Sequence, residues 1–429
     1  MMRLLYTLLL HLGLPLALLR LSWRGIRSPD YLLRWGERFG RVPETVASGS
    51  IWVHAVSVGE VNAAMPLARA LRQQYPEQSL LITTTTPTGS MQLTRSLGSG
   101  VDHCYLPYDY PWAIRTFLHH TRPQLAIIME TEIWPNLFKQ LSEHHIPIVM
   151  TNVRVSMRSF QGYRRMPGFV RETLSRVTLF AVQTRADAAR LRRLGAPGNR
   201  LKITNSIKFD VRLAPSLTEV ATVVRRDWGQ NRPVWVIGST HDDEEVQIIS
   251  VYKRLLTELP DLLVVLAPRH PERFAAVTRL CRRAGLRLQK RSEVKQVAAR
   301  TQIYLADSMG ELPVFFAAAD VALVGGSLIV GGGGHNVLEP CAVGVPVLFG
   351  PYMANFREIS QQVLSCGAGF EVSTEDDMVA QIHRLLTDPE ARFLAGEAGR
   401  ALVKRNKGAL QKTMDLIASV HDHTPISEQ

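Results

Sequence analysis

The sequence predicts an α/β protein with two doubly wound, parallel-sheet domains and an apolar helix at its N-terminus. Three observations lead to this prediction: apolar runs that alternate with helical segments, a middle segment without a strong strand, and a leucine-rich stretch over residues 4–19. A chain of 429 residues suits two or three domains that each bury a core. With 46% hydrophobic and 21% charged residues, the composition is that of a globular protein.

The first forty residues differ from the rest of the chain. Residues 4–19 are almost entirely apolar, Arg3 precedes them, and five arginines follow: Arg20, Arg24, Arg27, Arg34 and Arg38. About twenty apolar residues are needed to cross a bilayer upright, and no small-residue cleavage site follows the stretch. We therefore interpret residues 1–40 as an uncleaved membrane anchor, spanning or in-plane, whose arginines keep the body of the protein cytoplasmic. A buried N-terminal helix is the alternative.

The apolar runs fall into two series of predicted parallel strands. The segment between the series, residues 210–232, has no strong strand, so we place a domain boundary there, with domains at 41–215 and 216–429. Such domains bind ligands at the carboxyl ends of their strands, here in a shared cleft. The predicted strands are 51–59, 79–86, 125–130, 146–152 and 178–184 in the first domain, and 233–240, 262–270, 320–328 and 345–351 in the second.

Charge and cysteine usage narrow the possible partners. The net charge of +12 favours a polyanionic partner, either nucleic acid, anionic lipid or a phosphorylated substrate, unless the surface is only generally basic. The four cysteines are scattered, which argues against a zinc site or a disulfide framework and fits a reducing compartment. Apart from Glu130 and Glu132, no carboxylates have metal-ligand spacing, so we expect no metal.

Candidate functional residues of the first domain follow predicted strands. Glu60 opens a helix and is either an acid placed favourably at a helix N-terminus or a general base. If the preceding strand continues as far as Glu130 and Glu132, alternation places both side chains on the same side of the sheet. Each is either catalytic or paired with a nearby arginine such as Arg154. Lys208 precedes the domain boundary, and its side chain is either solvated at the surface or directed into the cleft as a candidate site residue.

A hydroxyl-rich turn at residues 83–89 contains Thr85, which either binds phosphate or sugar or belongs to a β-favouring run that caps the next helix. We assign Thr85 and Arg154 to acceptor or sugar binding.

In the second domain, Pro268 and Arg269 follow a predicted strand, and the side chains of Arg269 and His270 suit a phosphate or a carboxylate group. A turn at Met309, Gly310 and Glu311 offers backbone groups.

The stretch GGSLIVGGGGHNVLEP, residues 325–340, matches neither the P-loop nor the dinucleotide fingerprint. Asn336 and Glu339 have the spacing of a capping box, with Val337 and Leu338 between them. The same geometry suits a phosphate at a helix N-terminus and a ribose hydroxyl on Glu339.

Motifs along the chain resemble those of the bacterial Kdo (3-deoxy-D-manno-octulosonic acid) transferases of lipopolysaccharide biosynthesis. The resemblance runs in family order from the N-terminal segment to about Gly408, and the glycine run before His335 departs from the family pattern. The motifs are RWGERFG, HAVSVGE, TTTTPTGS, YLPYD, METEIWPN, NSIKFD, PRHPERF, DSMGEL, LVGGSL and GGHNVLEP.

The resemblance implies a GT-B fold, two Rossmann-like domains facing a cleft, and transfer of Kdo from CMP-Kdo to a lipid A precursor at the cytoplasmic face of the inner membrane. It implies Glu60 as the base and Glu130 with Lys208 as groups that stabilise the transition state. It implies no cofactor and no nucleic-acid partner. The CMP contacts that it implies are Pro268, Arg269, Met309, Gly310, Glu311, Asn336, Val337, Leu338 and Glu339.

Anionic membrane lipids are an expected partner of the basic chain. Residues 157–176 are a candidate membrane-facing surface or, alternatively, an ordinary amphipathic helix pair. We also keep two other functional classes: a nucleotide-sugar epimerase of the same fold, and a non-catalytic, membrane-tethered binder of nucleotide or lipid.

Overall fold

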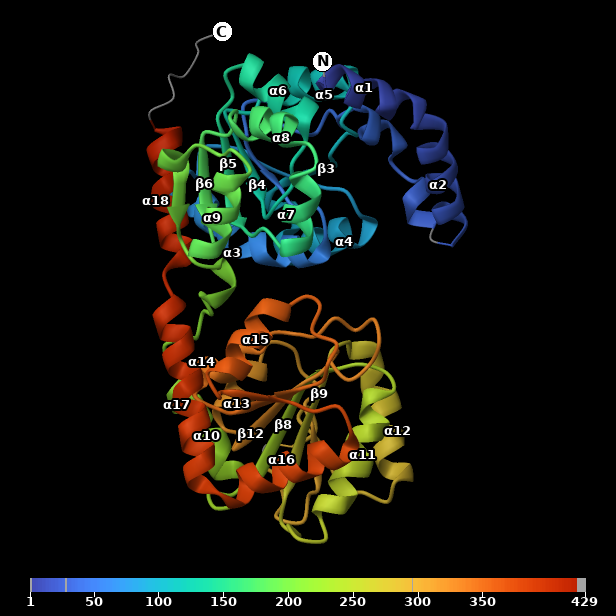
Figure 1. The fold of residues 1–429 in the computed structure, drawn as a ribbon. Helices are drawn as coiled ribbons and strands as arrows, with labels where there is room; N and C mark the ends of the chain where they lie inside the picture. Colours follow the sequence, from blue (N-terminus) through green and yellow to red (C-terminus); the bar gives the residue numbers. More distant parts are fainter. Residues whose placement is uncertain (1, 28, 295, 423–429) are drawn as a thin grey trace. The chain divides into compact units, whose positions relative to one another are not determined.

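The computed structural model describes residues 2–27, 29–294 and 296–422, and the chain divides into two compact units (Figure 1). Unit 1 consists of residues 1–210 and 408–429, and unit 2 of residues 211–407. The chain thus leaves unit 1 near the expected boundary but returns to it at Gly408, whereas the sequence-based assignment keeps everything up to residue 429 in the second domain. Residues 423–429 lie outside the described part of the chain.

A seven-stranded parallel sheet runs through unit 1 in the order β3-β2-β1-β4-β5-β6-β7. Alternate residues of its central strands belong to two different apolar clusters, because both faces of the sheet are covered. All five predicted runs form strands; β3 and β7, which are short and carry polar residues, are additional. The strands are β1 (Ile51–His54), β2 (Leu80–Thr84), β3 (Asp102–Tyr105), β4 (Leu125–Met129), β5 (Ile148–Val153), β6 (Leu179–Val182) and β7 (Leu201–Ile203).

Several helices of unit 1 begin where a side chain accepts a hydrogen bond from one of their first N–H groups. The hydroxyl groups of Ser57, Thr86 and Thr184 each accept a hydrogen bond from the third residue of the helix that follows. The helices between the strands are α3 (Val58–Gln74), α4 (Pro87–Leu97), α5 (Pro111–Thr121), α6 (Pro135–Glu143), α7 (Met157–Tyr163), α8 (Pro167–Leu174) and α9 (Arg185–Arg193).

The last described helix, α18 (Ala409–His421), packs on unit 1. Its buried residues Met414 and Ile417 belong to the apolar cluster that also contains Leu67 of α3. The carboxylate of Asp210 accepts hydrogen bonds from the backbone N–H groups of Gly408 and Leu410, and so holds the start of α18 beside the point where the chain leaves unit 1. These contacts explain why the C-terminal segment does not belong to unit 2.

Unit 2 contains a second seven-stranded parallel sheet, in the order β10-β11-β9-β8-β12-β13-β14. The four predicted runs form its central strands, and the shorter strands β10, β11 and β14 are additional. The strands are β8 (Val234–Thr240), β9 (Leu263–Pro268), β10 (Leu288–Lys290), β11 (Ile303–Leu305), β12 (Val321–Val324), β13 (Val347–Phe349) and β14 (Gly369–Glu371).

Eight helices of unit 2 surround this sheet in the described part of the chain. Buried leucine, isoleucine and tyrosine side chains of α11 and α16 join those of β8 and β9 in one apolar cluster. The helices are α10 (Leu217–Trp228), α11 (Glu244–Leu255), α12 (Phe274–Arg283), α13 (Leu312–Ala317), α14 (Leu338–Val343), α15 (Arg357–Ser365), α16 (Glu375–Thr387) and α17 (Pro389–Asn406).

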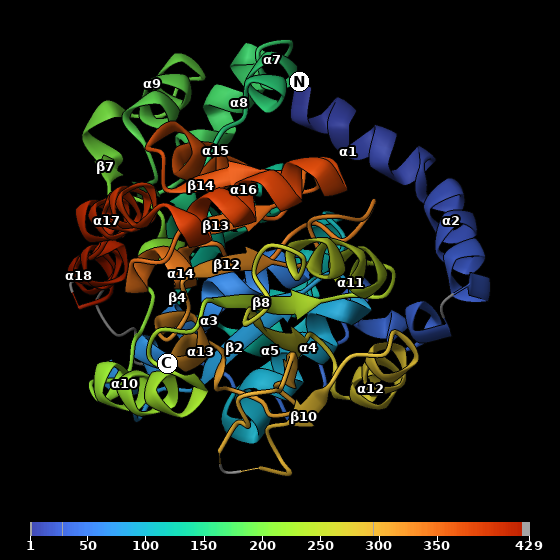
Figure 2. The same ribbon diagram turned by 90° about the horizontal axis from the view of Figure 1, so that it is seen from below.

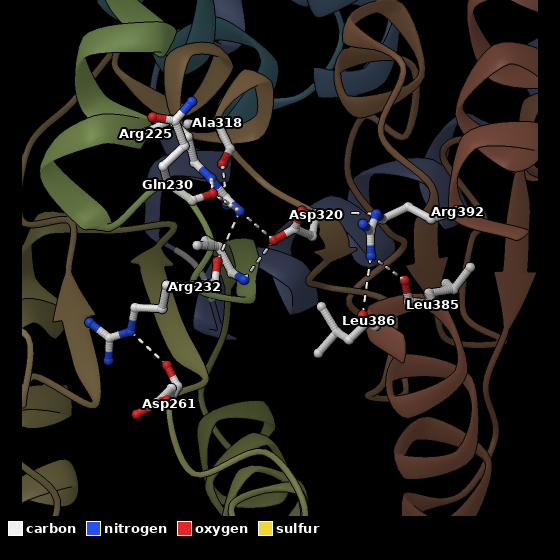
Figure 3. Close-up of polar contacts among 10 residues, drawn as sticks. Arg225, Gln230, Arg232, Asp261, Ala318, Asp320, Leu385, Leu386 and Arg392 are labelled. Atoms are coloured by element: carbon white, nitrogen blue, oxygen red, sulfur yellow. Dashed lines mark hydrogen bonds and ion pairs between the residues drawn. The ribbon is translucent and has the colours of Figure 1, made fainter. Parts of the chain in front are cut away.

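Asp320 fastens the amino edge of this sheet (Figure 3). Its carboxylate accepts hydrogen bonds from Nη2 of Arg225, at 3.0 Å, and from the backbone N–H of Val234, at 2.9 Å. A second arginine, Arg392 of α17, lies 3.9 Å away on the other carboxylate oxygen. The interaction ties α10, β8 and α17 together at the edge opposite to the strand ends that carry the predicted nucleotide contacts.

Two consecutive helices, α1 (Met2–Leu12) and α2 (Leu14–Arg27), form the N-terminal segment, with a bend between them (Figure 2). The Tyr6 hydroxyl donates to the buried carboxylate of Asp109 at 2.9 Å, and the Tyr110 hydroxyl donates to the carbonyl of Leu10, also at 2.9 Å. One face of α1 is therefore held on unit 1. Exposed leucines occupy other positions, with exposed fractions of 49–71%: Leu4, Leu5, Leu8, Leu9, Leu12, Leu16 and Leu19.

None of the described helices is by itself long and apolar enough to cross a bilayer. Met2–Leu12 and Leu14–Ile26 satisfy the length and composition criteria only as a pair, and the pair is bent by 47°.

Candidate active site

Glu60 lies where β1 gives way to α3 at the carboxyl edge of the unit 1 sheet. Its Oε2 accepts the backbone N–H of Val56 at 2.9 Å, and its Oε1 accepts the Ser57 hydroxyl at 3.2 Å. Burial raises the pKa of Glu60 to about 8; the Val56 hydrogen bond opposes this, and the charges of Glu132 and Glu130 add to it. A carboxyl group with this pKa exchanges a proton near neutral pH, as a general base requires.

Glu130 and Lys208 lie together at this edge. The Nζ of Lys208 is 4.0 Å from Oε1 of Glu130, and both side chains are largely buried. Lys208 sits in the short 3-10 helix η5 (Ile207–Phe209) after β7, at the edge strand. The predicted positions thus converge, although they are 78 residues apart in sequence.

The strand does not continue as far as Glu130 and Glu132, so the condition for their alternation along it is not met. Strand β4 ends at Met129, and Glu130 has a positive φ of 55°, which turns the chain out of the extended conformation. Glu132 instead accepts the indole N–H of Trp134 at 2.9 Å, and burial raises its pKa. Its charge contributes to the raised pKa of Glu60, so the two carboxyl groups lie close to each other.

Thr85 and Arg154 border the same cluster. The N–H and the hydroxyl of Thr85 both donate to the carbonyl of Val56, at 3.2 and 3.3 Å, so Thr85 holds the residue whose N–H binds Glu60. Arg154 follows β5, is half-buried, and its carbonyl accepts the hydroxyl of Thr131, next to Glu130. The helix-capping role of this turn belongs to Thr86.

Arg38 was not among the predicted site residues, yet it supports this turn. It is 3% exposed, its Nη1 donates to the carbonyl of Thr85 at 3.0 Å, and its guanidinium lies 4.4 Å from the ring centroid of Tyr105. No local pattern distinguishes Arg38 from the other arginines of residues 20–38, because its role depends on contacts with Thr85, which follows β2, and with Tyr105 of β3.

In unit 2, two of the predicted nucleotide segments come together at the carboxyl edge. Pro268 ends β9, and the backbone N–H of Arg269 donates to the carbonyl of Thr240, the last residue of the neighbouring strand β8. The pKa of Glu339 is raised by burial and lowered in part by its bond with Asn336 and by the charge of Arg269. Arg269 and Glu339 therefore lie near each other.

The turn at Met309, Gly310 and Glu311 leads from β11 into α13, and β11 neighbours β9 in the sheet. Met309 is 60% exposed and Gly310 has a φ of 88°, a conformation that favours glycine. The Glu311 carboxylate is bound by Arg291, at 3.1 Å, and by the Ser308 hydroxyl. The Glu311 side chain is therefore occupied, and the exposed part of this turn is its backbone at Met309 and Gly310.

The predicted capping box at Asn336 and Glu339 is wrong. Helix α14 starts at Leu338, so Glu339 is its second residue and the carboxylate accepts the Asn336 side chain at 3.1 Å, not the Asn336 backbone N–H. The Asn336 Oδ1 accepts the N–H of Leu338. Val337 and Leu338 are fully buried, so their side chains fill the core and leave only backbone groups for a ligand.

The glycine-rich stretch is shaped by the carboxylate of Glu244, which was not among the predicted site residues. Glu244, fully buried at the start of α11, accepts four backbone N–H groups at 2.8–3.0 Å, from His241, Gly326, Ser327 and Leu328. The chain then folds back so that the N–H of Gly334 donates to the carbonyl of Gly326 at 2.7 Å.

Close approach of the backbone explains the glycines. A Cβ at Gly332 would lie 2.3 Å from the carbonyl oxygen of Gly326, and Gly333 and Gly334 have positive φ values of 78° and 72°. The next residue, His335, shares a 2.8 Å contact between its Nε2 and that of His241, with the rings stacked. The glycines therefore allow a tight loop to bring His335 and Asn336 to the carboxyl edge.

The described residues contain no group of three or more His, Cys, Asp or Glu side chains arranged to hold a metal ion. The four cysteines are unpaired, and Cys104, Cys281 and Cys341 are buried.

Comparisons with known proteins cover both units. A family model described as 3-deoxy-D-manno-octulosonic-acid transferase (kdotransferase) matches residues 33–211, and one described as glycosyl transferases group 1 matches residues 242–402. A 3-deoxy-D-manno-octulosonic acid transferase of Haemophilus influenzae is 40% identical over 97% of this chain and 98% of its own. One from Bordetella pertussis is 34% identical over 90% of each chain.

Two solved structures are also similar. The UDP-GlcNAc 2-epimerase from Neisseria meningitidis matches 87% of this chain and 100% of its own, with 14% identity and a TM-score of 0.52, which is a likeness of fold. The C-terminal CMP-Kdo binding domain of WaaA from Acinetobacter baumannii is 36% identical, covers 46% of this chain with its full length, and has a TM-score of 0.41.

Two parallel-sheet units, matched by glycosyl transferase family models, define a GT-B-like glycosyltransferase, and the predicted site residues lie at the carboxyl edges of both sheets. Within that class, the chain belongs to the 3-deoxy-D-manno-octulosonic acid (Kdo) transferase family.

Replacing Glu244 by glutamine should destabilise the loop at Gly325–Leu328. The amide NH₂ of Gln would face two of the four backbone N–H groups, and leaving them unsatisfied costs about 3 kcal/mol. Urea unfolding should show a lower midpoint, and hydrogen exchange of residues 325–328 should accelerate.

Asp242→Asn is the control. Asp242 is in the same turn, but its side chain is 74% exposed and pairs with Arg273 at the surface, so loss of this ion pair should lower the free energy of unfolding by less than about 1 kcal/mol. Equal stability of Glu244→Gln and the wild type would contradict this account.

Proposed function

We propose that the chain is an inverting glycosyltransferase that moves Kdo from CMP-Kdo to a lipid A precursor (lipid IVA), releases CMP and needs no metal ion. The observation that carries the proposal is the half-buried carboxyl of Glu60, with its pKa of about 8, beside the Glu130–Lys208 pair. Membership of the Kdo transferase family supports Kdo as the transferred sugar.

Glu60 is the general base in this proposal. Its carboxylate takes the proton of the acceptor hydroxyl while the acceptor oxygen forms a bond to the anomeric carbon of Kdo. The bond from that carbon to the CMP phosphate breaks on the opposite side, and CMP leaves with the electron pair. A carboxyl with a pKa of about 8 is a stronger base than an ordinary glutamate and is still partly ionised near neutral pH.

Glu130 and Lys208 stabilise the charges that develop during transfer. Positive charge grows on the sugar ring as the bond to CMP breaks, and a fixed carboxylate favours it. The ammonium of Lys208 suits the negative charge carried by the Kdo carboxylate or the departing phosphate. We place Thr85 and Arg154 among the acceptor or sugar contacts, because both border this cluster.

The nucleotide contacts are proposed for unit 2. Arg269 pairs with the phosphate of CMP, Glu339 accepts ribose hydroxyls, and the backbone groups at Met309–Glu311 and Asn336–Leu338 complete the contacts. Two observations support these contacts: Arg269 lies near Glu339, and the backbone turn at Gly310 is exposed.

We propose further that α1 and α2 lie in the plane of the inner membrane, with the catalytic units on its cytoplasmic face. The exposed leucines of these helices suit the acyl boundary, and Arg3, Arg20 and Arg24 suit anionic headgroups. The hydrogen bonds of Tyr6 and Tyr110 favour an in-plane helix over an upright span, because they hold α1 along the surface of unit 1.

The central test is CMP release from CMP-Kdo in the presence of tetraacylated lipid A precursor and EDTA. The wild type should release CMP, whereas Glu60→Gln should lose roughly 10²–10⁴-fold in kcat, because the amide cannot take the hydroxyl proton. Calorimetric binding of CMP should be unchanged, since the proposed nucleotide contacts are in unit 2. Glu77→Gln, at an exposed position, is the matched control. Wild-type turnover in Glu60→Gln would contradict the base assignment, and no release in EDTA would contradict metal independence.

Membrane binding is tested with vesicles of phosphatidylethanolamine and phosphatidylglycerol. Leu12 and Leu16 are 68% and 71% exposed, and changing both to Asp places charges in the proposed apolar face. The double variant should bind vesicles roughly tenfold or more weakly in sedimentation. Val223→Asp, at a 52% exposed position of unit 2, should bind like the wild type. Undiminished binding of the double variant would show that this face does not contact lipid.

A further inference from the structure

Strand β5 contains a bulge directly beside the Glu130–Lys208 pair. Met150 pairs with Phe180 of β6, and Val153 pairs with Val182, so three steps along β5 match two along β6. The extra residue lies at Thr151–Asn152. Asn152 has a φ of 54° and is fully buried, an unusual combination for a residue other than glycine.

The Asn152 side chain holds the segment that carries Lys208. Its Oδ1 accepts the backbone N–H of Ile207 at 3.2 Å and the hydroxyl of Ser206, also at 3.2 Å. The N–H of Ile207 is a donor, so the oxygen end of the amide must face it. Ser206 Oγ in turn accepts the N–H of Lys208 at 3.4 Å.

The packing of its two neighbours then directs the side chain of Lys208. Ile207 and Phe209, on either side of Lys208, are 1% and 2% exposed and anchor η5 in the core. With both neighbours buried and the backbone held by Asn152, the Lys208 side chain extends toward Glu130, 4.0 Å away.

The other residue of the bulge holds Glu130. Thr151 pairs with Met129 of β4, and its carbonyl accepts the N–H of Glu130 at 2.8 Å. One two-residue bulge therefore fixes both members of the pair: Thr151 through the backbone of Glu130, and Asn152 through the backbone that precedes Lys208.

We infer that Asn152 is a positioning residue for sugar transfer, which sets the Lys208 ammonium against the Glu130 carboxylate. The residue type fits this role, since asparagine tolerates a positive φ and supplies an acceptor. Its Nδ2 is buried and has no hydrogen-bond partner among the described residues, so the amide is poorly suited to a purely stabilising role. The catalytic part of this inference rests on the proposed function of Lys208 and Glu130.

The test variant is Asn152→Gly, which keeps the left-handed backbone and removes the acceptor. Lys208 should become mobile, so its acetylation by acetic anhydride, followed by mass spectrometry, should accelerate roughly threefold or more relative to the exposed Lys202. Turnover should fall roughly tenfold to a hundredfold with the KM for CMP-Kdo unchanged. In a Lys208→Ala background, Asn152→Gly should add no further loss, because the two residues act through one group.

Asn205→Gly is the matched control, since Asn205 also has a positive φ, of 68°, in the same segment. It should change neither acetylation nor turnover. If Asn152→Gly does not fold, Ser206→Ala removes the hydroxyl between Asn152 and Lys208 and should shift both readouts in the same direction. Unchanged acetylation of Lys208 in these variants, or additive losses with Lys208→Ala, would overturn the positioning role. Faster acetylation at wild-type turnover would leave the positioning intact and instead refute the proposed role of Lys208.

Discussion

Buried carboxylates that accept backbone N–H groups fix the loops at the carboxyl edge of both sheets. Glu244 binds four such groups from two loops, and Asp109 binds the first N–H groups of α6 together with the Tyr6 hydroxyl. Parallel strands bring many loop ends to one edge, where their N–H groups need partners. The carboxylates satisfy these groups and give each loop a single conformation.

Glu60 uses the same interaction but differs in a way that suits catalysis. It accepts one backbone N–H, from Val56, and one hydroxyl, from Ser57, whereas both oxygens of Glu244 are occupied by two N–H groups each. Burial near two other carboxyl groups then raises the pKa of Glu60. The hydrogen bonds orient the group while leaving it able to gain and lose a proton. Asn152 extends this design, because it orients Lys208 through Ser206 and the backbone N–H of Ile207.

Much of the fold and of the site is predictable from sequence, for physical reasons that also explain the failures. Central strands such as β4 are continuous apolar runs because both faces are covered, whereas the edge strand β3 reads DHCY. The positions of the candidate site residues Glu60 and Arg269 are predictable because both residues follow such strands. The roles of Glu244 and Asn152 are not predictable in this way, since three of the four partners of Glu244 lie 82–84 residues away and the partners of the Asn152 side chain lie 54–55 residues away. The capping box does not form because α14 begins at Leu338, so Val337 and not Asn336 is the N-cap and Glu339 is the second residue of the helix, not the third.

The proposed mechanism depends most on burial, which raises the pKa of the Glu60 carboxyl to about 8, above neutral pH. The pH dependence of kcat/KM for CMP-Kdo transfer, measured from about pH 5.5 to 9.5, tests this directly. The account predicts a roughly tenfold rise per pH unit that levels off near pH 8, where Glu60 loses its proton. A profile that is flat over this range, as a glutamate with the ordinary pKa of about 4.3 would give, would contradict it.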